Sequence, residues 1–577
     1  MKRIGLLVSL IMIASLLVSC ATPTPEVIEK EVEKIVTQVV KETVKETVIV
    51  EGTPQVVEKE VTKIVEKVEV VTATPVPKGG DTLYFRLSEA PETLYNVETI
   101  SLTADGVMGD YLLERLVYFD AKGKAQGWLA ESWEVSEDQT ELTFKLREGV
   151  KFHDDTDFNA DAVKFHFDSI MDPDKASPVL AYLGSLKEVT VIDDYTVKFV
   201  FEEPYAPFFI NISYSYGGIN SPTAIQKSGE EYGRHPVGTG PYMLEEWIPG
   251  SQITLVRTPN YKQFRTDVVN PGPPLAEKIV LTVIPEDGTA QAALETGEIL
   301  VSGLSADTVA RFVGDPEYNV VVDKEATNLV FLEFNYEKPP FDDPAFRRAL
   351  GYAINRQAAV RAAWSGYASP ALSPLALGIP GFDPAVAEEY GTPYDPDKAA
   401  ELLAELGWVD SDGDELLDKD GQPAKFLIRS YAGYTHIQRT LEVIQDNLKD
   451  LGIEVELELA DWGAFYPSLL ETDWDMDLMR WTWGDPVVMS DLFRSPGHRG
   501  HLPPDPEIDD VLDRCDTTMD PDLRAACASE AQRVLLEKML AVPILTNWAM
   551  YVTRGEVRDY TIDFSGYLLP GDVWLEK

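Results

Sequence analysis

Cysteine and histidine are scarce in this sequence, which has three cysteines and six histidines among 577 residues. No two cysteines stand in the Cys-x-x-Cys arrangement that is typical of zinc sites and thiol redox sites. The Gly-x-Ser-x-Gly, His-Glu-x-x-His and P-loop motifs are also absent from the sequence, and these motifs mark many hydrolases, metalloproteases and nucleotide-binding enzymes. We therefore predict that the chain is not an enzyme and that it uses no metal and no cofactor.

Basic residues are in short supply as well. Lysine and arginine number 50 against 97 aspartates and glutamates, which gives a formal net charge of -47 at pH 7. A nucleic-acid-binding protein needs a basic footprint, and docking on anionic lipid needs a basic patch. Both classes of partner are excluded by this balance, and we interpret the acidic surface as a solvated one.

Long apolar runs are limited to residues 4–18, which follow Lys2 and Arg3. This run is too short to span a bilayer comfortably and fits a secretory signal. It ends in Leu17-Val18-Ser19-Cys20, which resembles the bacterial lipobox. We expect residues 1–19 to be removed and lipidated Cys20 to hold an extracytoplasmic protein on the outer face of the cytoplasmic membrane. An ordinary signal with a chance cysteine and an uncleaved anchor helix are the alternatives.

Residues 20–80 differ in composition from everything after them. The text of residues 24–36 returns almost letter for letter at 53–65, and both copies are rich in valine, glutamate and lysine. Ile28, Val32 and Ile35 have the spacing of a coiled-coil seam, but valine and threonine are mediocre helix formers. We predict a low-complexity stalk that is partly helical at best, and a coil that binds a partner is the alternative.

The other two cysteines, Cys515 and Cys527, flank a predicted turn over 516–522 between two predicted helices. An oxidising compartment permits a disulfide that closes this helical hairpin. Two buried free thiols are the alternative.

Residues 81–577 have the pattern of a mixed α/β protein, and their number requires two or three lobes. Runs rich in β-branched residues predict strands over 83–87, 142–146, 196–201, 253–257, 279–284, 329–335, 426–429, 453–459 and 544–552.

Several predicted helices have readable ends. A helix that Thr435 is predicted to cap stops at Gly452 and is followed at once by a strand, which indicates an αβ unit of a mostly parallel sheet. Asn159 and Asp395 are predicted to cap the helices that follow them. A single longer helix is predicted over 344–364 from its apolar spacing.

An acidic segment, residues 410–421, has aspartate at loop positions one, three and five of the calcium-loop pattern. Glu415 stands where that pattern needs glycine, and Gly421 stands where it needs a bidentate glutamate. We interpret the segment as an acidic hairpin without metal, with a calcium loop as the alternative.

Aromatic residues are the more promising sign of a binding site. They crowd residues 205–216, which include Tyr214, and again residues 462–483. Trp481 and Trp483 precede Asp485 where a predicted strand enters a Gly-Asp-Pro loop. Rigid aromatic rings beside a carboxylate at a strand end are typical of a ligand cleft. We predict Trp481, Trp483, Asp485, Tyr214 and also Tyr95 as ligand-binding residues.

Several segments together resemble the extracytoplasmic solute-binding proteins, family 5, of peptide-type ABC importers. The resemblance runs in the family's order through nearly all of residues 81–577. Its clearest segments are 128–135, 142–154, 159–163, 236–242, 346–356, 410–421 and 451–455.

The fold that this resemblance implies is a two-lobed α/β periplasmic-binding-protein fold with an extra inserted subdomain. The first lobe would collect residues 81–111, about 218–330 and about 541–577. The inserted subdomain would be about 112–217, and the second lobe about 331–540.

The function that the resemblance implies is capture of a small solute between two lobes that close by a hinge, followed by delivery to the ABC permease. A peptide is the favoured solute, an oligosaccharide or a metal chelate is the alternative, and the protein is expected to be a monomer. A solute sensor and a secreted hydrolase are the rival functions, and the missing catalytic motifs count against the hydrolase.

The chain departs from the family in the cleft loop. Peptide-binding members have a tryptophan, two further residues and then the aspartate that holds the peptide amine. Asp485 is one residue too far from Trp481 and one too close to Trp483. Asp485 is therefore expected either to pair with a solute ammonium group or to support the turn that follows it.

Overall fold

The computed structural model describes residues 31–50, 53–72, 81–324, 327–470, 474–495, 502–564 and 566–576. The chain divides into two compact units, residues 1–78 and 79–577, which are described separately below. Within the described ranges, no helix is both long enough and apolar enough to cross a membrane. Cys20 lies outside the described residues.

The first unit contains a β-hairpin, so the prediction of a partly helical stalk is wrong for its described part. Strands β1 (Glu31–Val50) and β2 (Thr53–Thr72) pair antiparallel, from Glu31 opposite Thr72 to Val50 opposite Thr53. Valine, isoleucine and threonine are branched at Cβ, which favours extended backbone over helix. This preference overrides the helical spacing of the apolar residues.

The second unit holds a seven-stranded sheet with the order β10-β11-β12-β3-β13-β23-β14. Strands β12, β3 and β13 run parallel, whereas β23 runs antiparallel to both of its neighbours. We call the part built on this sheet lobe I. Its strands are β3 (Thr82–Leu87), β10 (Tyr242–Ile248), β11 (Gln252–Arg257), β12 (Lys278–Val283), β13 (Val301–Gly303), β14 (Tyr318–Asp323) and β23 (Ala549–Arg554).

A six-stranded sheet with the order β16-β22-β15-β21-β19-β20 forms the centre of a second part, lobe II. The predicted αβ unit is confirmed, because α12 (Thr435–Lys449) connects β19 to the parallel strand β20. The predicted cap at Thr435 is wrong, because Thr435 is already helical and the N-cap residue Tyr434 makes no side-chain capping hydrogen bond. Strand β15 runs antiparallel to both neighbours, so the sheet is mixed. The strands are β15 (Asn328–Phe334), β16 (Ala368–Pro370), β19 (Lys425–Tyr431), β20 (Glu454–Ala460), β21 (Met476–Thr482) and β22 (Ala541–Asn547).

A four-stranded antiparallel sheet, β6-β7-β9-β8, lies in the chain between β3 and β10 and forms an inserted subdomain. Helix α3 (Ala160–Met171) packs on it, and Asn159 caps α3 as predicted. The strands are β6 (Ala130–Val135), β7 (Glu141–Leu146), β8 (Leu186–Asp193) and β9 (Thr196–Phe201). The predicted fold class, two α/β lobes with an extra subdomain, is confirmed.

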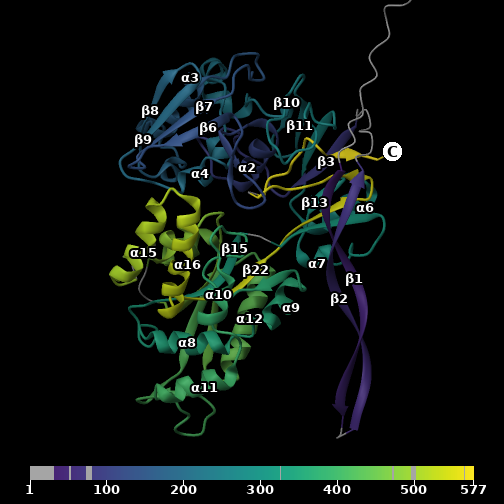
Figure 1. Cartoon of the computed structure of the whole chain (residues 1–577). Helices are drawn as coiled ribbons and strands as arrows, with labels where there is room; N and C mark the ends of the chain where they lie inside the picture. Colours follow the sequence, from purple (N-terminus) through teal and green to yellow (C-terminus); the bar gives the residue numbers. More distant parts are fainter. Residues whose placement is uncertain are drawn as a thin grey trace, which may run out of the picture. The chain divides into compact units, whose positions relative to one another are not determined.

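The remaining α-helices of the second unit are mostly in lobe II, where α8, α9 and α12 pack against its sheet and α11 packs on α8 (Figure 1). They are α2 (Leu102–Val107), α4 (Phe208–Asn211), α5 (Pro222–Ser228), α6 (Asp287–Thr296), α7 (Ala306–Val309), α8 (Pro344–Ala353), α9 (Arg356–Trp364), α10 (Pro384–Tyr390), α11 (Pro396–Glu405), α13 (Trp462–Ser468), α14 (Val487–Phe493), α15 (Pro506–Thr517) and α16 (Pro521–Glu537).

Short elements complete the second unit. The π-helical turn η1 (Met108–Leu112) continues α2, and 3-10 turns are η2 (Pro173–Lys175), η3 (Leu180–Leu183), η4 (Ser215–Gly217) and η5 (Gly229–Arg234). Two-stranded ribbons pair β4 (Val117–Phe119) with β5 (Ala125–Gly127), β17 (Asp418–Lys419) with β18 (Gln422–Pro423) and β24 (Val557–Arg558) with β25 (Trp574–Leu575).

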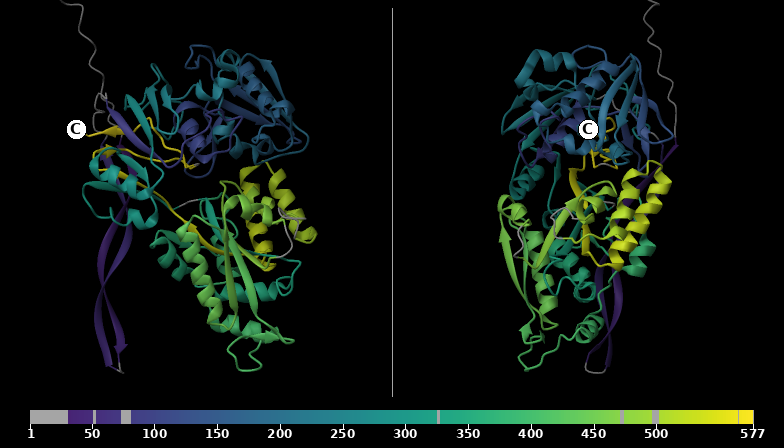
Figure 2. Two further views of the ribbon diagram at one scale, coloured as in Figure 1. Left: turned by 180° about the vertical axis from the view of Figure 1, so that it is seen from behind. Right: turned by 90° about the vertical axis from the view of Figure 1, so that its left-hand side faces the viewer.

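The chain passes between the two large sheets at two places, after β14 and after β22. The prediction of one strand over 544–552 is wrong, because β22 pairs in lobe II and β23 pairs in lobe I, with Trp548 between them. The predicted boundary between lobe II and the last part of lobe I, at 540/541, therefore lies before β22, whereas the observed boundary follows β22. Residues 544–552 contain no glycine or proline, and Asn547 alone does not reveal the break, which follows from the strand pairing. Both views of Figure 2 show the yellow C-terminal chain running between the two halves.

The predicted helix over 344–364 is also divided, into α8 and α9. Ile354 has an extended backbone, and the side chain of Asn355 accepts a hydrogen bond of 2.9 Å from the amide of Ala358. A side-chain acceptor at this position starts a new helix. Apolar spacing does not reveal such an internal cap, because it continues through the break.

Candidate ligand site

The loop with the predicted ligand residues follows β21, which pairs with β15 and β19 inside the lobe II sheet. Residues Met476 to Met479 of this strand are buried, whereas Trp481 is half-buried and Thr482 is exposed. The loop then turns into α14 at Pro486. The predicted change from strand to loop at Gly-Asp-Pro is thus observed. The buried half of the strand fixes the direction in which the loop leaves the sheet.

Trp483 connects lobe II with the chain around the inserted subdomain. Its ring stacks on Tyr182 at 5.2 Å between ring centroids, and its centroid is 6.4 Å from that of Tyr214. Tyr182 in turn stacks on Tyr216 at 4.9 Å and almost parallel. We call Trp483, Tyr182, Tyr214 and Tyr216 the ring cluster. Stacked aromatic rings offer rigid apolar faces with little conformational entropy to lose.

Gly484 allows the loop to approach the ring cluster closely. A Cβ atom at this position would lie 2.6 Å from the hydroxyl oxygen of Tyr214. A side chain at residue 484 would therefore push the loop and Tyr214 apart. Burial raises the pKa of the Tyr214 hydroxyl, so this group is a neutral hydrogen-bonding group at physiological pH.

Asp485 is buried and forms a bidentate ion pair with Arg524. The guanidinium donates to the two carboxylate oxygens over 2.6 and 2.5 Å, and the Asp485 carboxylate also accepts the amide of Val487 at 2.9 Å. The expected ammonium partner is therefore replaced by an arginine of the chain itself. This geometry agrees with the alternative in which Asp485 supports the turn. Arg524 lies 39 residues away on α16, and nothing near Asp485 in the sequence points to it.

A disulfide bond holds the helix that supplies Arg524. Cys515 on α15 and Cys527 on α16 are joined, with their Cα atoms 5.4 Å apart. The Nε atom of Arg524 donates a hydrogen bond of 2.9 Å to the carbonyl of Cys515. The disulfide therefore lies next to the group that orients the guanidinium toward Asp485.

Two further carboxylates close to this pair have raised pKa values. Burial raises the pKa of Asp516 to about 7, against the opposing effects of Ser490 and Arg494. Burial and the charge of Asp485 raise the pKa of Asp491 to about 6. The loop region is thus crowded with acidic groups that compete for the available arginines.

A cavity of about 440 Å³ opens beside the Asp485–Arg524 pair. Two hydrogen bonds near this cavity join the inserted subdomain to lobe II. The Ala206 amide donates to the Asp516 carbonyl at 2.8 Å, and the Met519 amide donates to the Gln139 side chain at 2.9 Å. The volume is in the range of small-molecule sites. Its apolar lining includes Phe119, Trp133, Phe209, Ile210 and Met519.

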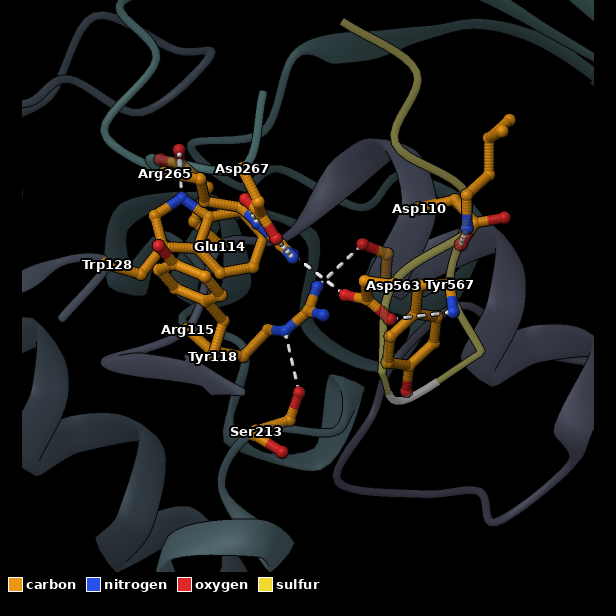
Figure 3. A network of polar contacts seen from close by, with 12 residues as sticks. Asp110, Glu114, Arg115, Tyr118, Trp128, Ser213, Arg265, Asp267, Asp563 and Tyr567 are labelled. Atoms are coloured by element: carbon orange, nitrogen blue, oxygen red, sulfur yellow. Dashed lines mark hydrogen bonds and ion pairs between the residues drawn. The ribbon is translucent and has the colours of Figure 1, made fainter. Parts of the chain in front are cut away.

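A buried polar network holds the segment that carries Tyr214 and Tyr216 (Figure 3). The guanidinium of Arg115 lies between the rings of Trp128 and Tyr567, at 4.5 and 4.6 Å, and donates to the Ser213 carbonyl at 3.0 Å. Asp105 accepts hydrogen bonds from the Tyr567 hydroxyl at 2.6 Å and from the Ser215 amide at 3.1 Å. A fully bonded network of this kind is rigid, so one wall of the ring cluster is preorganised.

Tyr95 lies in the buried core against which Tyr214 packs, and in the described part of the chain its aromatic ring contact is with Tyr232 and not with Trp483. Tyr95 is 4% exposed, and its ring centroid is 4.9 Å from that of Tyr232 in the core of the inserted subdomain. Tyr182, Tyr567 and Arg524 were not predicted. Tyr182 stands alone in its sequence neighbourhood, so only the fold reveals that it belongs with Trp483.

The acidic segment 410–421 ends within the β17–β18 hairpin, of which it contains the first strand, and it does not lead into a helix, as the hairpin interpretation predicted. The carboxylates of Asp410, Asp412 and Asp414 converge within 4.8 Å and are exposed. The amide of Gly413 donates to Asp410 at 2.6 Å, and the amide of Asp414 donates to Asp412 at 3.2 Å. These carboxylates therefore already stabilise the turn through backbone amides.

Residues 124–500 match the family described as bacterial extracellular solute-binding proteins, family 5 Middle. The glutathione-binding protein GsiB of Shigella flexneri is 30% identical over 457 residues, which cover 74% of this chain and 81% of that protein. NikA from Brucella suis, solved in complex with Fe(III)-EDTA, is 26% identical with a TM-score of 0.75 and covers 86% of this chain and 100% of its own.

The oligopeptide-binding protein AppA from Bacillus subtilis, solved in complex with a nonapeptide, shares the fold with a TM-score of 0.68. It is 23% identical and covers 87% of this chain and 100% of its own. The family match extends over more than half of the chain. The fold shared with the solved structures agrees with the two lobes and the inserted subdomain described above. The chain belongs to the bacterial extracellular solute-binding proteins of family 5.

Proposed function

We propose that this protein captures a small solute between lobe I and lobe II and delivers it to the permease of an ABC importer. The observation that carries the proposal is the ring cluster, in which Trp483 of lobe II stacks on Tyr182 and contacts Tyr214. Contacts between lobe II and the inserted subdomain stabilise a closed form, and a ligand that adds to them shifts the population toward closure. Such a protein binds and releases its solute unchanged.

A peptide or peptide-like molecule is the favoured solute. The relatives include a glutathione-binding protein and an oligopeptide-binding protein, and the apolar cavity beside the loop suits side chains of such a ligand. NikA, solved with Fe(III)-EDTA, makes a metal chelate the second candidate, followed by an oligosaccharide.

The predicted site residues receive different roles in this proposal. Trp483 and Tyr214 line the site and contact the solute with their rings, and Trp481 extends the same wall from the end of β21. Asp485 supports the loop, because both of its oxygens are bound by Arg524. Tyr95 supports the inserted subdomain.

The proposal places the protein on the outer face of the cytoplasmic membrane, held by lipidated Cys20. The support is the Leu17-Val18-Ser19-Cys20 segment and the polar stalk after it. Labelling of cells with a palmitate analogue should mark the wild-type protein and should be lost in Cys20→Ala. A Cys20→Ala variant that still carries the label would contradict the anchor.

A ligand screen tests the proposed capture. The purified chain is mixed with di- to pentapeptides, glutathione, oligosaccharides and Fe(III)-EDTA, and thermal unfolding and the radius of gyration are measured. A bound solute stabilises the folded state by mass action, and closure reduces the radius of gyration. Stabilisation without closure, or conversion of the stabilising compound into a product, would overturn the proposal.

The ring cluster is tested with two variants and the solute from that screen. Trp483→Ala should lower the affinity about tenfold or more, because it removes the stacking face. Trp462→Ala is the matched control, since Trp462 is 48% exposed and lies on α13 outside the ring cluster. An equal affinity of the Trp483→Ala variant and the wild type would remove Trp483 from the site.

A further inference from the structure

A second cavity, of about 600 Å³, lies within lobe I. Its walls come from the carboxyl end of β3, from α2 and η1, from β13 and from the start of β23. Strands β3 and β13 run parallel, and ligands of α/β proteins commonly bind outside the carboxyl ends of such strands. The cavity is separate in its lining from the one beside Asp485.

One carboxylate in this cavity has an unused oxygen. Asp110 accepts the amide of Leu568 at 2.9 Å through Oδ1, and within the described part of the chain its Oδ2 atom has no hydrogen-bond or ion-pair partner. The neighbouring carboxylates are committed, since Asp105 binds Tyr567 and Ser215 and Asp563 binds Arg265 at 2.8 Å. Figure 3 shows Asp110 at the edge of this network, facing away from Arg265.

The cations near Asp110 are engaged elsewhere. Arg115 donates to the carbonyls of Ser213, Gly109 and Leu113. Arg86, which lines the cavity, pairs with Asp287 at 2.8 Å and donates to three backbone carbonyls. An ionised carboxylate that is partly withdrawn from water is stabilised by a cation, and the half-buried Asp110 has none from the described chain. The cavity thus presents a carboxyl group that lacks a counter-charge when it ionises.

Aromatic rings surround the same space. Phe85, Tyr111, Tyr551 and Tyr560 all line the cavity. Their ring centroids are 6.3 Å apart for Phe85 and Tyr111, 6.4 Å for Phe85 and Tyr560, and 5.5 Å for Tyr551 and Tyr560. In the described ranges no hydrogen-bond partner occupies the three tyrosine hydroxyls. Ring faces attract organic cations through their quadrupoles.

We propose that this cavity binds an organic cation, an alkylammonium or quaternary ammonium group, with Asp110 as the counter-charge and Phe85, Tyr111, Tyr551 and Tyr560 as the cage. The proposal rests on the proposed function in that the cation is part of the captured solute. In this proposal the positive charge of the solute is bound by Asp110 in lobe I and not by Asp485, because Arg524 already pairs with Asp485.

The position of the cavity connects cation binding with lobe movement. Ala549, Met550 and Tyr551 line it and directly follow Trp548, where the chain crosses from β22 to β23. A group that fixes Tyr551 therefore acts on one of the two strands that join the lobes. In this proposal, cation binding in lobe I favours one conformation of the chain at Trp548, where it passes from lobe II to lobe I.

The charge state of Asp110 supplies a second readout. Burial, and after it the charge of Asp563, raises the pKa of Asp110 well above its usual range, against the opposing effects of the Leu568 amide and Arg115. Asp105, Arg86 with Asp287, and the hydroxyls of Tyr111, Tyr551 and Tyr560 complete the polar groups around it. A bound cation favours the ionised carboxylate, so binding releases a proton and the affinity rises with pH.

Saturation-transfer NMR on the full chain tests the proposal with choline, n-butylammonium and the neutral choline isostere 3,3-dimethyl-1-butanol. Both cations should receive saturation from the wild-type protein, and the isostere should receive much less. Asp110→Asn keeps the acceptor for Leu568 and should lower the affinity for choline about tenfold or more. Asp342→Asn, an exposed site of equal charge in lobe II, is the control and should behave as the wild type.

The outcomes separate the proposal from its alternatives. Equal signals for choline and its neutral isostere, or an unchanged choline affinity in a folded Asp110→Asn variant, would overturn it. If circular dichroism shows that Asp110→Asn does not fold, Tyr560→Leu replaces it. This variant should bind choline more weakly than the wild type, and the wild type should still prefer choline to its neutral isostere. If choline binds but no screened solute closes the lobes, the proposed function is refuted and the cation site stands. If a screened solute closes the lobes but choline does not bind, the cation site is refuted and the proposed function stands.

Discussion

Asp485, which is buried, and Asp110, which is half-buried, are both carboxylates beside cavities, but they differ in what binds them. Asp485 in lobe II has both oxygens in an ion pair with Arg524, whereas Asp110 in lobe I has one backbone amide and no cation in the described chain. A carboxylate that is fully bonded inside the protein supports the fold, and one with a free oxygen toward a cavity is available to a ligand. The two sites therefore differ in whether a carboxylate oxygen is free to bind a ligand, although only Asp485 lies in a recognisable sequence motif.

The two regions also differ in how their acidic groups are balanced. Lobe II supplies an arginine for Asp485, and another, Arg429, for Asp477 at 3.1 Å. Near Asp110, the carboxylate of Glu114 is bound by the Trp128 indole at 2.9 Å and the Tyr261 hydroxyl at 2.7 Å. Neutral donors stabilise a buried carboxylate less than a guanidinium does. The pKa of Glu114 is accordingly raised to about 7, as burial also raises the pKa of Asp516 beside the lobe II loop.

The largest effect is expected from removing the guanidinium of Arg524. Arg524→Ala leaves Asp485 as an uncompensated buried charge, which should lower the free energy of unfolding by about 3 to 5 kcal/mol. Urea denaturation measures it. Lys164→Ala breaks the exposed pair with Asp168 and should cost no more than about 0.5 kcal/mol. Similar losses in the two variants would mean that Asp485 is not a scaffold residue.

Opening the disulfide should have the next largest effect, because it releases the hairpin that positions Arg524. The bond closes a loop with a sequence separation of 12 residues, for which the chain-entropy relation gives about 3 kcal/mol. Reduction of the wild type should lower the melting temperature to that of a Cys515→Ala/Cys527→Ala variant. That double variant is the control, since a reductant should leave it unchanged; a melting temperature that also stays constant in the wild type would refute the expectation.

Glu114 should make the stability of the lobe I region depend on pH. Burial raises its pKa from 4.5 to about 7, so below pH 4.5 the carboxyl is neutral in both the folded and the unfolded state. Above pH 7 the folded state must hold a buried charge, and the free energy of unfolding should have fallen by up to about 3 kcal/mol relative to Glu114→Gln. Urea denaturation of both proteins at pH 5 and pH 8 measures this difference.

The exposed Glu188 provides the control for that experiment. Glu188→Gln should follow the wild type at both pH values. A constant difference between wild type and Glu114→Gln from pH 5 to pH 8 would show that Glu114 titrates normally in the folded state.

The smallest effect is expected on solute binding by Asp485→Asn. If Arg524 occupies this carboxylate, the substitution should lower the melting temperature but change the affinity for the screened solute less than about threefold, because only loop order is affected. Titration calorimetry measures the affinity, with Trp483→Ala as the comparison variant. A loss of about thirtyfold or more for a solute with an ammonium group would instead place Asp485 in direct contact with it.

Local patterns predicted the individual strands well, because each strand carries its own β-branched, apolar run. The strands over 142–146 and 196–201 were located to within one residue, and the caps at Asn159 and Asp395 were identified correctly. The run 544–552 is mostly apolar on both sides of Thr546 and Asn547, and pairing with β15 on one side and β13 on the other divides it at Trp548. A run of apolar residues specifies a strand but not the sheet that the strand joins.

The amino-acid sequence by itself determined the acidic character, the α/β class and the family, since these depend on composition, short periodic patterns and motifs. The tertiary structure decided which polar groups are bound to one another. Arg524 reaches Asp485 across 39 residues, and Tyr182 reaches Trp483 from another part of the fold. Whether a carboxylate is free for a ligand depends on such long-range partners, because a buried charge is stable only where the folded chain or a ligand supplies its counterpart.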